Sequence, residues 1–392
     1  MKKIISKLMG GVLLFGLSMS LTSCEGALDD ILGEWSRPTP GSSTGGAETS
    51  ISISPTTLAL KVGETGQLTA TVDPAGTAVT WISDQEAIAT VDANGLVTAK
   101  ADGTATITAK AGDKSATCTV TVTEVYTAKD YKKASWNDTD KKVEFTKQTA
   151  PSDPTALTNS VTSWSGWYTV SGNVTITGNV TLGAETHLIL QDGATLTING
   201  QLYCKTNDLY IYGQKKGDGK LNVTNNSGTA INSNKHIDIH GGEVTASAAG
   251  DTSNGITTRY LAVYGGKLTA TSGGVNGISF VNTIDVYGGE VVATSNATSS
   301  LVPYYGIIGS SSASKILTVY GGKVTATGNG KGYSPGYGSG FGCYVKSGTS
   351  GIKFYFSADV TTWGDGTSYT SATIVGLNDA DAATKKRYAK AE

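Results

Sequence analysis

Apolar and polar residues alternate along most of the chain with the two-residue period of β-strands. From Ile51 to Val122 the alternation falls into seven or so short runs, separated by turn signals such as Asp73-Pro74 and Asn94-Gly95. Short strands at this spacing predict an antiparallel β-sandwich over residues 50–124. We expect Trp81, which lies inside one of these runs, to belong to the sandwich core rather than to a binding surface.

From about Val161 a longer repeat replaces the simple alternation. Its clearest copies carry a Gly-Gly pair whose first members are Gly241, Gly265, Gly288 and Gly321. A period near 23 residues with two or three short strands per copy predicts a stacked β-solenoid, because the blades of a β-propeller need about 40 residues. We therefore expect an all-β protein in which an Ig-like β-sandwich is followed by a right-handed parallel β-helix over residues 161–375.

The repeat also predicts which side chains point inward and where one coil is longer. In the first copy the inward residues should be Ile237, Ile239, Val244 and Ala246. The longer step before Gly321 indicates an insertion near residues 295–312, at a place where solenoids accept loops.

Stacked coils place equivalent residues in columns about 4.8 Å apart. The residue after each Gly-Gly pair alternates in charge along the coils: Glu243, Lys267, Glu290, Lys323. Opposite charges on neighbouring strands attract, so this column is expected to fix the register of the coils.

The position before each Gly-Gly pair predicts a second column, which is aromatic: Tyr212, His240, Tyr264, Tyr287, Tyr320. Two interpretations remain open. The rings can simply stabilise the solenoid, or they can form a flat platform for stacking against sugar rings or an extended chain. Tyr333, Tyr337 and Phe341, in a Gly-rich loop near the C-terminal end, are further candidate ligand contacts.

Residues 125–160 are more polar and predict a connector that also caps the solenoid. They predict a hairpin, with Ala134–Trp136 on one arm and Val143–Phe145 on the other. Residues 376–392 are expected to form a polar tail. Only 16% of the chain is charged and the net charge is −2, which excludes the dense cationic surface needed by a nucleic-acid-binding protein.

The N-terminus has the three parts of a secretory signal over residues 1–23. The sequence Leu21-Thr22-Ser23-Cys24 resembles the lipobox of bacterial lipoproteins. That resemblance implies that Cys24 is lipidated and begins the mature chain. A plain secretory signal containing a Cys is the alternative.

Residues 24–49, rich in Pro, Gly, Ser and Thr toward their end, are expected to form a flexible tether. Glu25, Asp29 and Asp30 resemble the surface-export signals of some Gram-negative lipoproteins, which implies an outer membrane lipoprotein displayed on the cell surface.

The remaining cysteines, Cys118, Cys204 and Cys343, are expected to be buried free thiols. No C-x-x-C or Cys/His cluster supports a metal site, so no cofactor is predicted, although Ca²⁺ is left open.

Two parts of the chain resemble known families. The runs Leu68–Ala75, Val79–Trp81 and Ile88–Val97 make residues 50–124 similar to the bacterial immunoglobulin-like group 2 domain, a non-catalytic spacer and adhesive module of surface proteins. Residues 161–327 resemble the solenoidal carbohydrate-binding domains of bacterial surface proteins, on the Gly-Gly-[Glu/Lys] copies and the run Leu188–Ile198. That second resemblance implies a polysaccharide or a host or cell-surface glycan as partner.

Many β-helices are polysaccharide lyases or hydrolases, so a catalytic site in the solenoid is a further possibility. Asp238 and Asp285 share a column but lie two coils apart, about 9.6 Å, which is too far to share one Ca²⁺. That separation is compatible with an inverting glycosidase pair, but no third polar group accompanies it. We therefore expect no enzyme. A glycan-binding or adhesive surface lipoprotein is the leading hypothesis, followed by a purely structural surface protein and then by a polysaccharide-degrading enzyme.

Overall fold

The computed structural model describes residues 49–297, 304–309 and 316–328 with their side chains, and β30–β35 by their backbone alone. It divides into two compact units at Val122 and Thr123. Every regular element in the described ranges is a β-strand, as the sequence predicts. The signal segment, Cys24 and the greater part of the tether lie outside the described residues.

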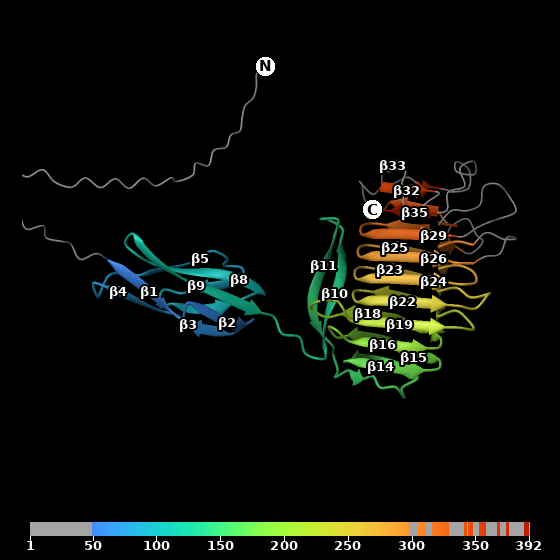
Figure 1. Cartoon of the computed structure of the whole chain (residues 1–392), viewed down its shortest axis with the longest axis horizontal. Helices are drawn as coiled ribbons and strands as arrows, with labels where there is room; N and C mark the ends of the chain where they lie inside the picture. Colours follow the sequence, from blue (N-terminus) through green and yellow to red (C-terminus); the bar gives the residue numbers. More distant parts are fainter. Residues whose placement is uncertain are drawn as a thin grey trace, which may run out of the picture. The chain divides into compact units, whose positions relative to one another are not determined.

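The first unit is a β-sandwich of short antiparallel strands (Figure 1). Its core contains Leu68, Val97, Ile107 and Val120, all at most 1% exposed, and Trp81 packs against it as expected. Its strands are β1 (Ser50–Ser54), β2 (Thr57–Lys61), β3 (Thr65–Gln67), β4 (Thr69–Asp73), β5 (Thr80–Ser83), β6 (Ala89–Val91), β7 (Leu96–Ala99), β8 (Gly103–Ala111) and β9 (Lys114–Thr123).

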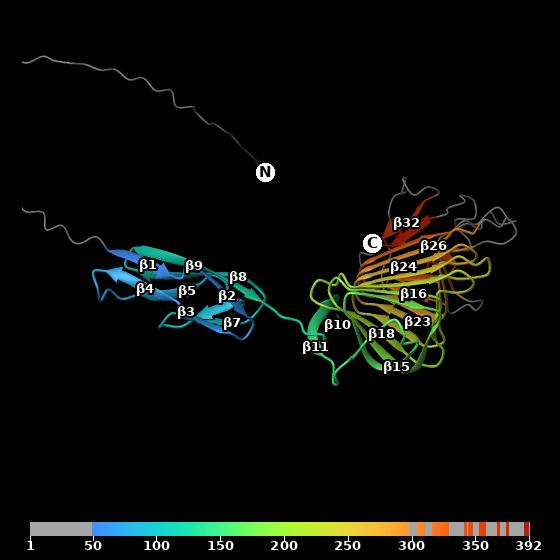
Figure 2. The same ribbon diagram turned by 60° about the horizontal axis from the view of Figure 1, so that its bottom comes forward.

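The second unit begins with a hairpin and continues as a solenoid of parallel strands, which Figure 2 shows stacked coil upon coil. Nearly all pairings between coils are parallel, which confirms the β-helix-like prediction. The hairpin is β10 (Asp130–Asn137) and β11 (Lys142–Thr149).

Two long sheets form the walls of the solenoid. The first contains β12 (Thr155–Ala156), β13 (Ser163–Val170), β15 (Val180–Leu190), β17 (Leu202–Cys204), β18 (Leu209–Gly213), β20 (Ile231–Ser233), β21 (His236–Ile239), β23 (Ile256–Val263), β25 (Ile278–Val286), β27 (Ile307–Gly309), β28 (Ile316–Val319), β30 (Phe341–Gly342), β31 (Tyr344–Ser347) and β34 (Ile374–Val375). The second contains β14 (Asn173–Thr177), β16 (Thr195–Asn199), β19 (Lys220–Asn225), β22 (Glu243–Ala248), β24 (Lys267–Ser272), β26 (Glu290–Ser295), β29 (Lys323–Thr327), β32 (Lys353–Ser357), β33 (Thr367–Ser368) and β35 (Tyr388–Ala391).

The solenoid core lies between these walls and follows the predicted pattern. Ile237, Ile239, Val244 and Ala246 are each at most 2% exposed, and their counterparts in the next coils are buried with them. Cys118 and Cys204 are buried free thiols in their respective units, as expected, whereas Cys343 lies outside the described residues.

The Gly-Gly pair makes the sharp corner between the two walls. Gly266 has a φ of +75°, and a Cβ built there would lie 2.2 Å from the carbonyl oxygen of Gly242 in the coil below. A larger residue is therefore opposed both by the backbone conformation and by the close approach of adjacent coils. This requirement explains why the pair recurs in every clear copy of the repeat.

The predicted charge column is present on the second wall. Glu243 pairs in register with Lys267, Lys267 with Glu290, and Glu290 with Lys323, and Lys220 extends the column at its start. Ion pairs of 2.9 Å join Lys220 to Glu243 and Lys267 to Glu290.

The C-terminal residues differ from the expected tail. The segment Tyr388–Ala391 forms β35, which pairs antiparallel with β29 and with β32. Among the described strands no parallel coil follows β29 on this wall, so a strand running the other way can supply the hydrogen bonds that the edge needs. Much of the predicted insertion near 295–312 falls outside the described residues, but β26 and β29 on either side of it remain in register.

Candidate functional site

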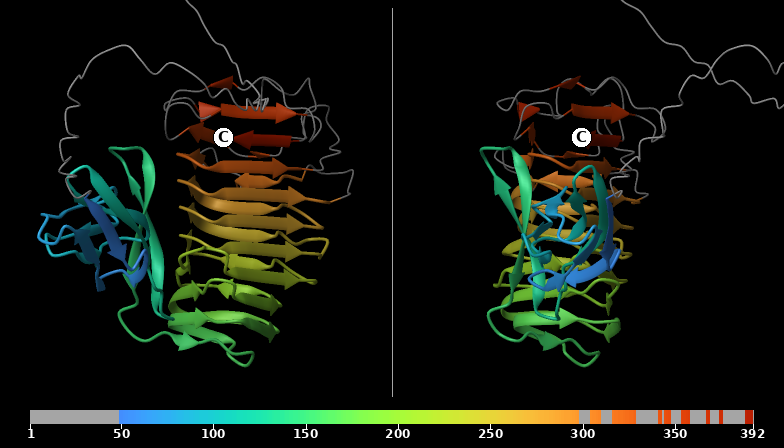
Figure 3. Two further views of the ribbon diagram at one scale, coloured as in Figure 1. Left: turned by 60° about the vertical axis from the view of Figure 1, so that its left-hand side comes forward. Right: turned by 90° about the vertical axis from the view of Figure 1, so that its left-hand side faces the viewer.

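The β10–β11 hairpin lies along the first wall of the solenoid, beside the corner formed by the Gly-Gly pairs (Figure 3). The absence of side chains at these corners lets the hairpin approach. A Cβ on Gly265 would lie 2.8 Å from the ring of Phe145, and one on Gly288 would lie 3.1 Å from a methyl group of Val143. The glycines therefore serve both the turn and the docking of β11.

The five predicted aromatic residues form one stack along the solenoid axis, which we call the tyrosine column: Tyr212, His240, Tyr264, Tyr287, Tyr320. Successive ring centroids are 4.5–4.9 Å apart and the planes are inclined by 5–14°. The faces of the rings are thus occupied by neighbouring rings. The column presents ring edges and hydroxyl groups outward, which differs from the flat platform for sugar stacking considered from the sequence.

Side chains of β10 cover part of the tyrosine column. Tyr131 contacts Tyr212 with 4.3 Å between ring centroids. Trp136 lies against Tyr287 and Tyr320 at 5.6 and 5.5 Å. The predicted connector is therefore a cover for the column as well as a link between the two units.

A backbone contact also ties the hairpin to the column. The Nδ1 of His240 lies 3.0 Å from the carbonyl oxygen of Ala134, so its N–H donates to that oxygen. Burial lowers the pKa of His240 to about 4, which keeps the ring neutral at neutral pH.

A second, shorter stack lies beside the first on the same wall. Trp167 stacks on His187 at 4.1 Å, and His187 stacks on Tyr210 at 4.8 Å. In the following coils the same position is occupied by Asp238 and then Ala262. The ring stack therefore ends at Tyr210, and the small Ala262 side chain leaves room beyond Asp238.

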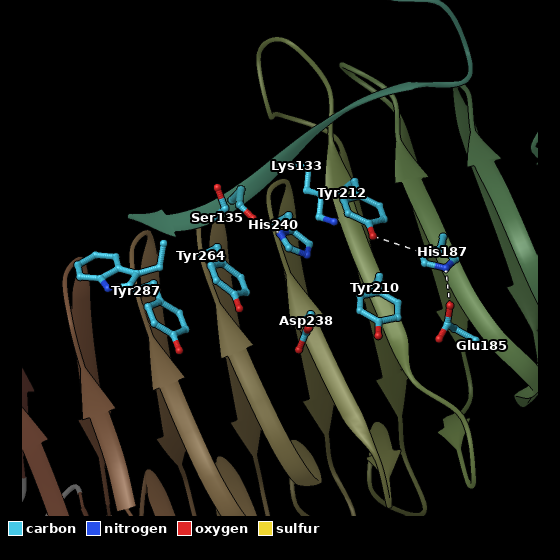
Figure 4. A pocket seen from close by; sticks show the side chains of 12 residues that line it. Lys133, Ser135, Glu185, His187, Tyr210, Tyr212, Asp238, His240, Tyr264 and Tyr287 are labelled. Atoms are coloured by element: carbon cyan, nitrogen blue, oxygen red, sulfur yellow. Dashed lines mark hydrogen bonds and ion pairs between the residues drawn. The ribbon is translucent and has the colours of Figure 1, made fainter. Parts of the chain in front are cut away.

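The end of the second stack and the hairpin together line an open cavity of about 540 Å³ (Figure 4). Its volume lies within the range typical of small-molecule sites. We call it the hairpin cavity, and its lining combines aromatic edges with polar and charged groups: Lys133, Ala134, Ser135, Trp136, Glu185, His187, Tyr210, Tyr212, Asp238, His240, Tyr264, Tyr287.

One polar chain holds the end of the cavity nearest β15. The Nε2 of His187 lies 2.9 Å from Oε1 of Glu185, and its Nδ1 lies 3.2 Å from the hydroxyl of Tyr212. All three groups are satisfied when Nε2–H donates to Glu185 and Nδ1 accepts from Tyr212. This chain fixes the orientation of the His187 ring.

The Asp238 carboxyl is the exception among the lining groups. Its Oδ1 is shielded from solvent and has no hydrogen-bond partner among the residues that the structure describes. Burial is the main cause that raises the pKa of Asp238 to about 6, with nearby Asp208 adding to the rise and His236 opposing it. A buried acceptor left unmet costs about 1–3 kcal/mol.

The structure thus brings the tyrosine column together, and four of its five rings line the cavity: Tyr212, His240, Tyr264, Tyr287. Tyr333 and Tyr337 lie outside the described residues, and the side chain of Phe341 is not described. The sequence did not single out Lys133, Glu185 or Tyr210. A periodic signal existed for the second stack, because His187, Tyr210 and Asp238 occupy equivalent positions in successive coils.

Two further properties concern only the described ranges. In them no group of three His, Cys, Asp or Glu residues is placed to hold a metal ion. Nor does this part of the chain contain a helix long and apolar enough to cross a membrane.

Comparison with protein families supports the sandwich assignment. Residues 47–122 match the model of the bacterial Ig-like domain (group 2). Domains of this family are typical of bacterial surface and adhesion proteins. No curated protein matches the chain.

Proposed function

We propose that the protein is a cell-surface lipoprotein that binds carbohydrate non-catalytically, and that the hairpin cavity is its binding site. Sugar hydroxyls need a dense set of hydrogen-bonding groups, and the cavity, which is open to solvent on one side, brings phenol hydroxyls, carboxyls and an ammonium group together. The cavity lies on a rigid stack of coils, which favours precise recognition. The bacterial Ig-like domain supports display at a surface, since such domains are typical of surface proteins.

The observation that carries this proposal is a cavity whose lining includes the unmet carboxyl of Asp238, at one place in a regular solenoid. The rings of the tyrosine column contribute through their edges and hydroxyls, because their faces are occupied. Tyr264 and Tyr287 are the column members we expect to matter most, since both line the cavity. Adhesion to a glycan-coated cell is the activity that such a site would serve.

Replacing Tyr264 and Tyr287 together by Phe tests this site. The double variant retains the stacked rings and loses only the hydroxyls. On a glycan array, the wild-type chain should bind a defined glycan class, and the double variant should bind it at least tenfold more weakly. Tyr203→Phe, on β17 and outside the cavity lining, is the matched control and should bind as the wild type does.

A purely structural surface protein is the second candidate, and one specific observation favours it. The tyrosine column is satisfied by its own rings and by the hairpin, as expected of a stabilising stack. A wild-type chain that binds no glycan on the array would favour this alternative. We do not favour a lyase or hydrolase, because the coils on either side of Asp238 place Tyr210 and Ala262 in its column. The second acid of the cavity lining, Glu185, is engaged by the Nε2 of His187 at 2.9 Å.

Anchoring through Cys24 is part of the same proposal and has its own test. Lipidation of a cysteine would retain the protein in the membrane fraction. Cys24→Ala should release it into the soluble fraction, whereas Cys118→Ala should not. Unchanged fractionation of Cys24→Ala would reject the lipobox interpretation.

A further inference from the structure

Two aspartates on the first wall provide an internal comparison. Asp238 and Asp285 occupy the same column two coils apart, with Ala262 between them. The carboxyl of Asp285 accepts hydrogen bonds from the hydroxyls of Thr283, at 3.2 Å, and of Thr318. The Oδ1 of Asp238 has no such partner, and only Asp238 lines the hairpin cavity.

A buried carboxyl oxygen that accepts no hydrogen bond lowers the stability of the fold. Native proteins keep such groups mainly where they serve a function. Asp238 lines the cavity with a carboxyl that has one shielded, unmet oxygen, so this carboxyl lacks donors more than any other lining group, and the part of it that faces the cavity points to a ligand group that donates a hydrogen bond there.

The surrounding charges restrict what that ligand group can be. Glu185 lies on the same wall and adds a second negative group to the cavity lining, while Lys133 reaches over the cavity from the hairpin (Figure 4). Glu185 is already held by the Nε2 of His187 at 2.9 Å. One carboxyl, Asp238, and one ammonium, Lys133, are left to face a ligand, so a ligand of either charge meets a like charge. A neutral hydroxyl can donate to Asp238 and accept from Lys133 at the same time.

We propose, on the basis of the carbohydrate-binding function above, that the hairpin cavity selects neutral glycans. A sugar hydroxyl donates to the Asp238 carboxylate, while the ammonium of Lys133 donates to the same or an adjacent hydroxyl oxygen. The phenol hydroxyls of Tyr264 and Tyr287 line the cavity beside it. Uronic acids and other anionic sugars are excluded by Asp238.

The test compares three chemical classes of oligosaccharide on the full chain at neutral pH. Neutral cello- and manno-oligosaccharides, oligogalacturonate, and glucosamine oligomers with free amines are titrated by calorimetry. At least one neutral class should bind, with at least tenfold preference over both charged classes. Tighter binding of oligogalacturonate or of the amine oligomers would overturn the proposed selectivity while leaving a carbohydrate-binding protein.

The variants Asp238→Asn and Asp285→Asn complete the experiment. Asp238→Asn should weaken neutral-glycan binding at least tenfold and at the same time raise the melting temperature, because the amide removes a buried charge. Asp285→Asn should bind within twofold of the wild type. A purely structural role for Asp238 predicts a change in melting temperature without a change in affinity, and that result would overturn the inference.

A complete lack of glycan binding would reject the carbohydrate-binding function as well as the selectivity for neutral glycans. If the wild-type chain binds none of the three oligosaccharide classes, and none of the glycans on the array, the proposed carbohydrate-binding function fails and this inference fails with it.

Discussion

The two walls of the solenoid are built from the same coils, yet they differ in how faithfully each coil repeats the last. On the second wall, hydroxyl side chains continue from coil to coil, as when Thr245 pairs with Thr269 and Ser247 with Thr271. On the first wall, a stack of rings gives way to Asp238 and then to Ala262. A side chain that repeats from coil to coil can contact the equivalent side chain in the next coil. Where the repeat breaks, a side chain loses that equivalent partner. In this solenoid the candidate site lies where repetition stops.

The β10–β11 hairpin is a second difference between the walls, because it lies along the first one. Loss of its contacts should lower the stability of the second unit more than any other change predicted below. Trp136→Ala deletes the contacts with Tyr287 and Tyr320 and should lower the free energy of unfolding of the second unit by about 2–3 kcal/mol, at the low end for a large buried ring because Trp136 is only partly buried. Urea denaturation followed by circular dichroism measures the change.

Val125→Ala, at a residue 48% exposed in the connector, is the control for Trp136→Ala and should change the unfolding free energy by less than about 0.5 kcal/mol. Equal behaviour of the two variants would show that the hairpin does not cover the tyrosine column in solution.

Asp238→Asn should have the next largest effect, and of opposite sign. At pH 7 the folded protein pays to keep Asp238 charged, because burial raises its pKa to about 6, above the value near 3.9 of an unfolded chain. Removing the charge should stabilise the second unit by about 1–2 kcal/mol. Asp285→Asn, which removes a carboxyl held by two threonines, should give a smaller gain or a loss.

The stabilisation by Asp238→Asn should depend on pH in a defined window. Above pH 6 wild-type Asp238 is charged in both states and the full penalty applies. As the pH falls from 6 to 4 the folded wild type binds a proton, the penalty disappears, and the two proteins should converge. His240, whose pKa is lowered to about 4, destabilises both proteins equally on acidification and cancels in the difference. A difference that stays constant from pH 7 to pH 4 would contradict the raised pKa of Asp238.

The smallest effect is expected on the regular wall. Lys267→Glu places three acids in adjacent coils and should cost about 0.5–1 kcal/mol at low salt, with less effect at high salt. Thermal unfolding at two salt concentrations measures it. A melting temperature that is unchanged at low salt would mean that ion pairing contributes nothing to the register there.

The sequence could predict the regular parts of this molecule because the Gly-Gly pair sets the register. Once Gly241 and Gly265 are aligned, the order of the charge column and of the tyrosine column follows. The docking of the hairpin could not be predicted in the same way, since the contact between Ala134 and His240 joins residues 106 positions apart and has no period. The burial of the Asp238 carboxyl and the unmet hydrogen bond at its Oδ1 depend on that docking and on the neighbouring Ala262. The sequence alone therefore could not reveal them.

The alternation of Lys and Glu on the second wall also limits how such a gene can grow. Duplicating a single coil would place two lysines or two glutamates side by side, whereas duplicating two coils together preserves the order Lys220, Glu243, Lys267, Glu290. Selection against like-charge neighbours would therefore favour solenoids whose lengths differ by even numbers of coils. The charge column therefore favours lengthening of the solenoid by pairs of coils.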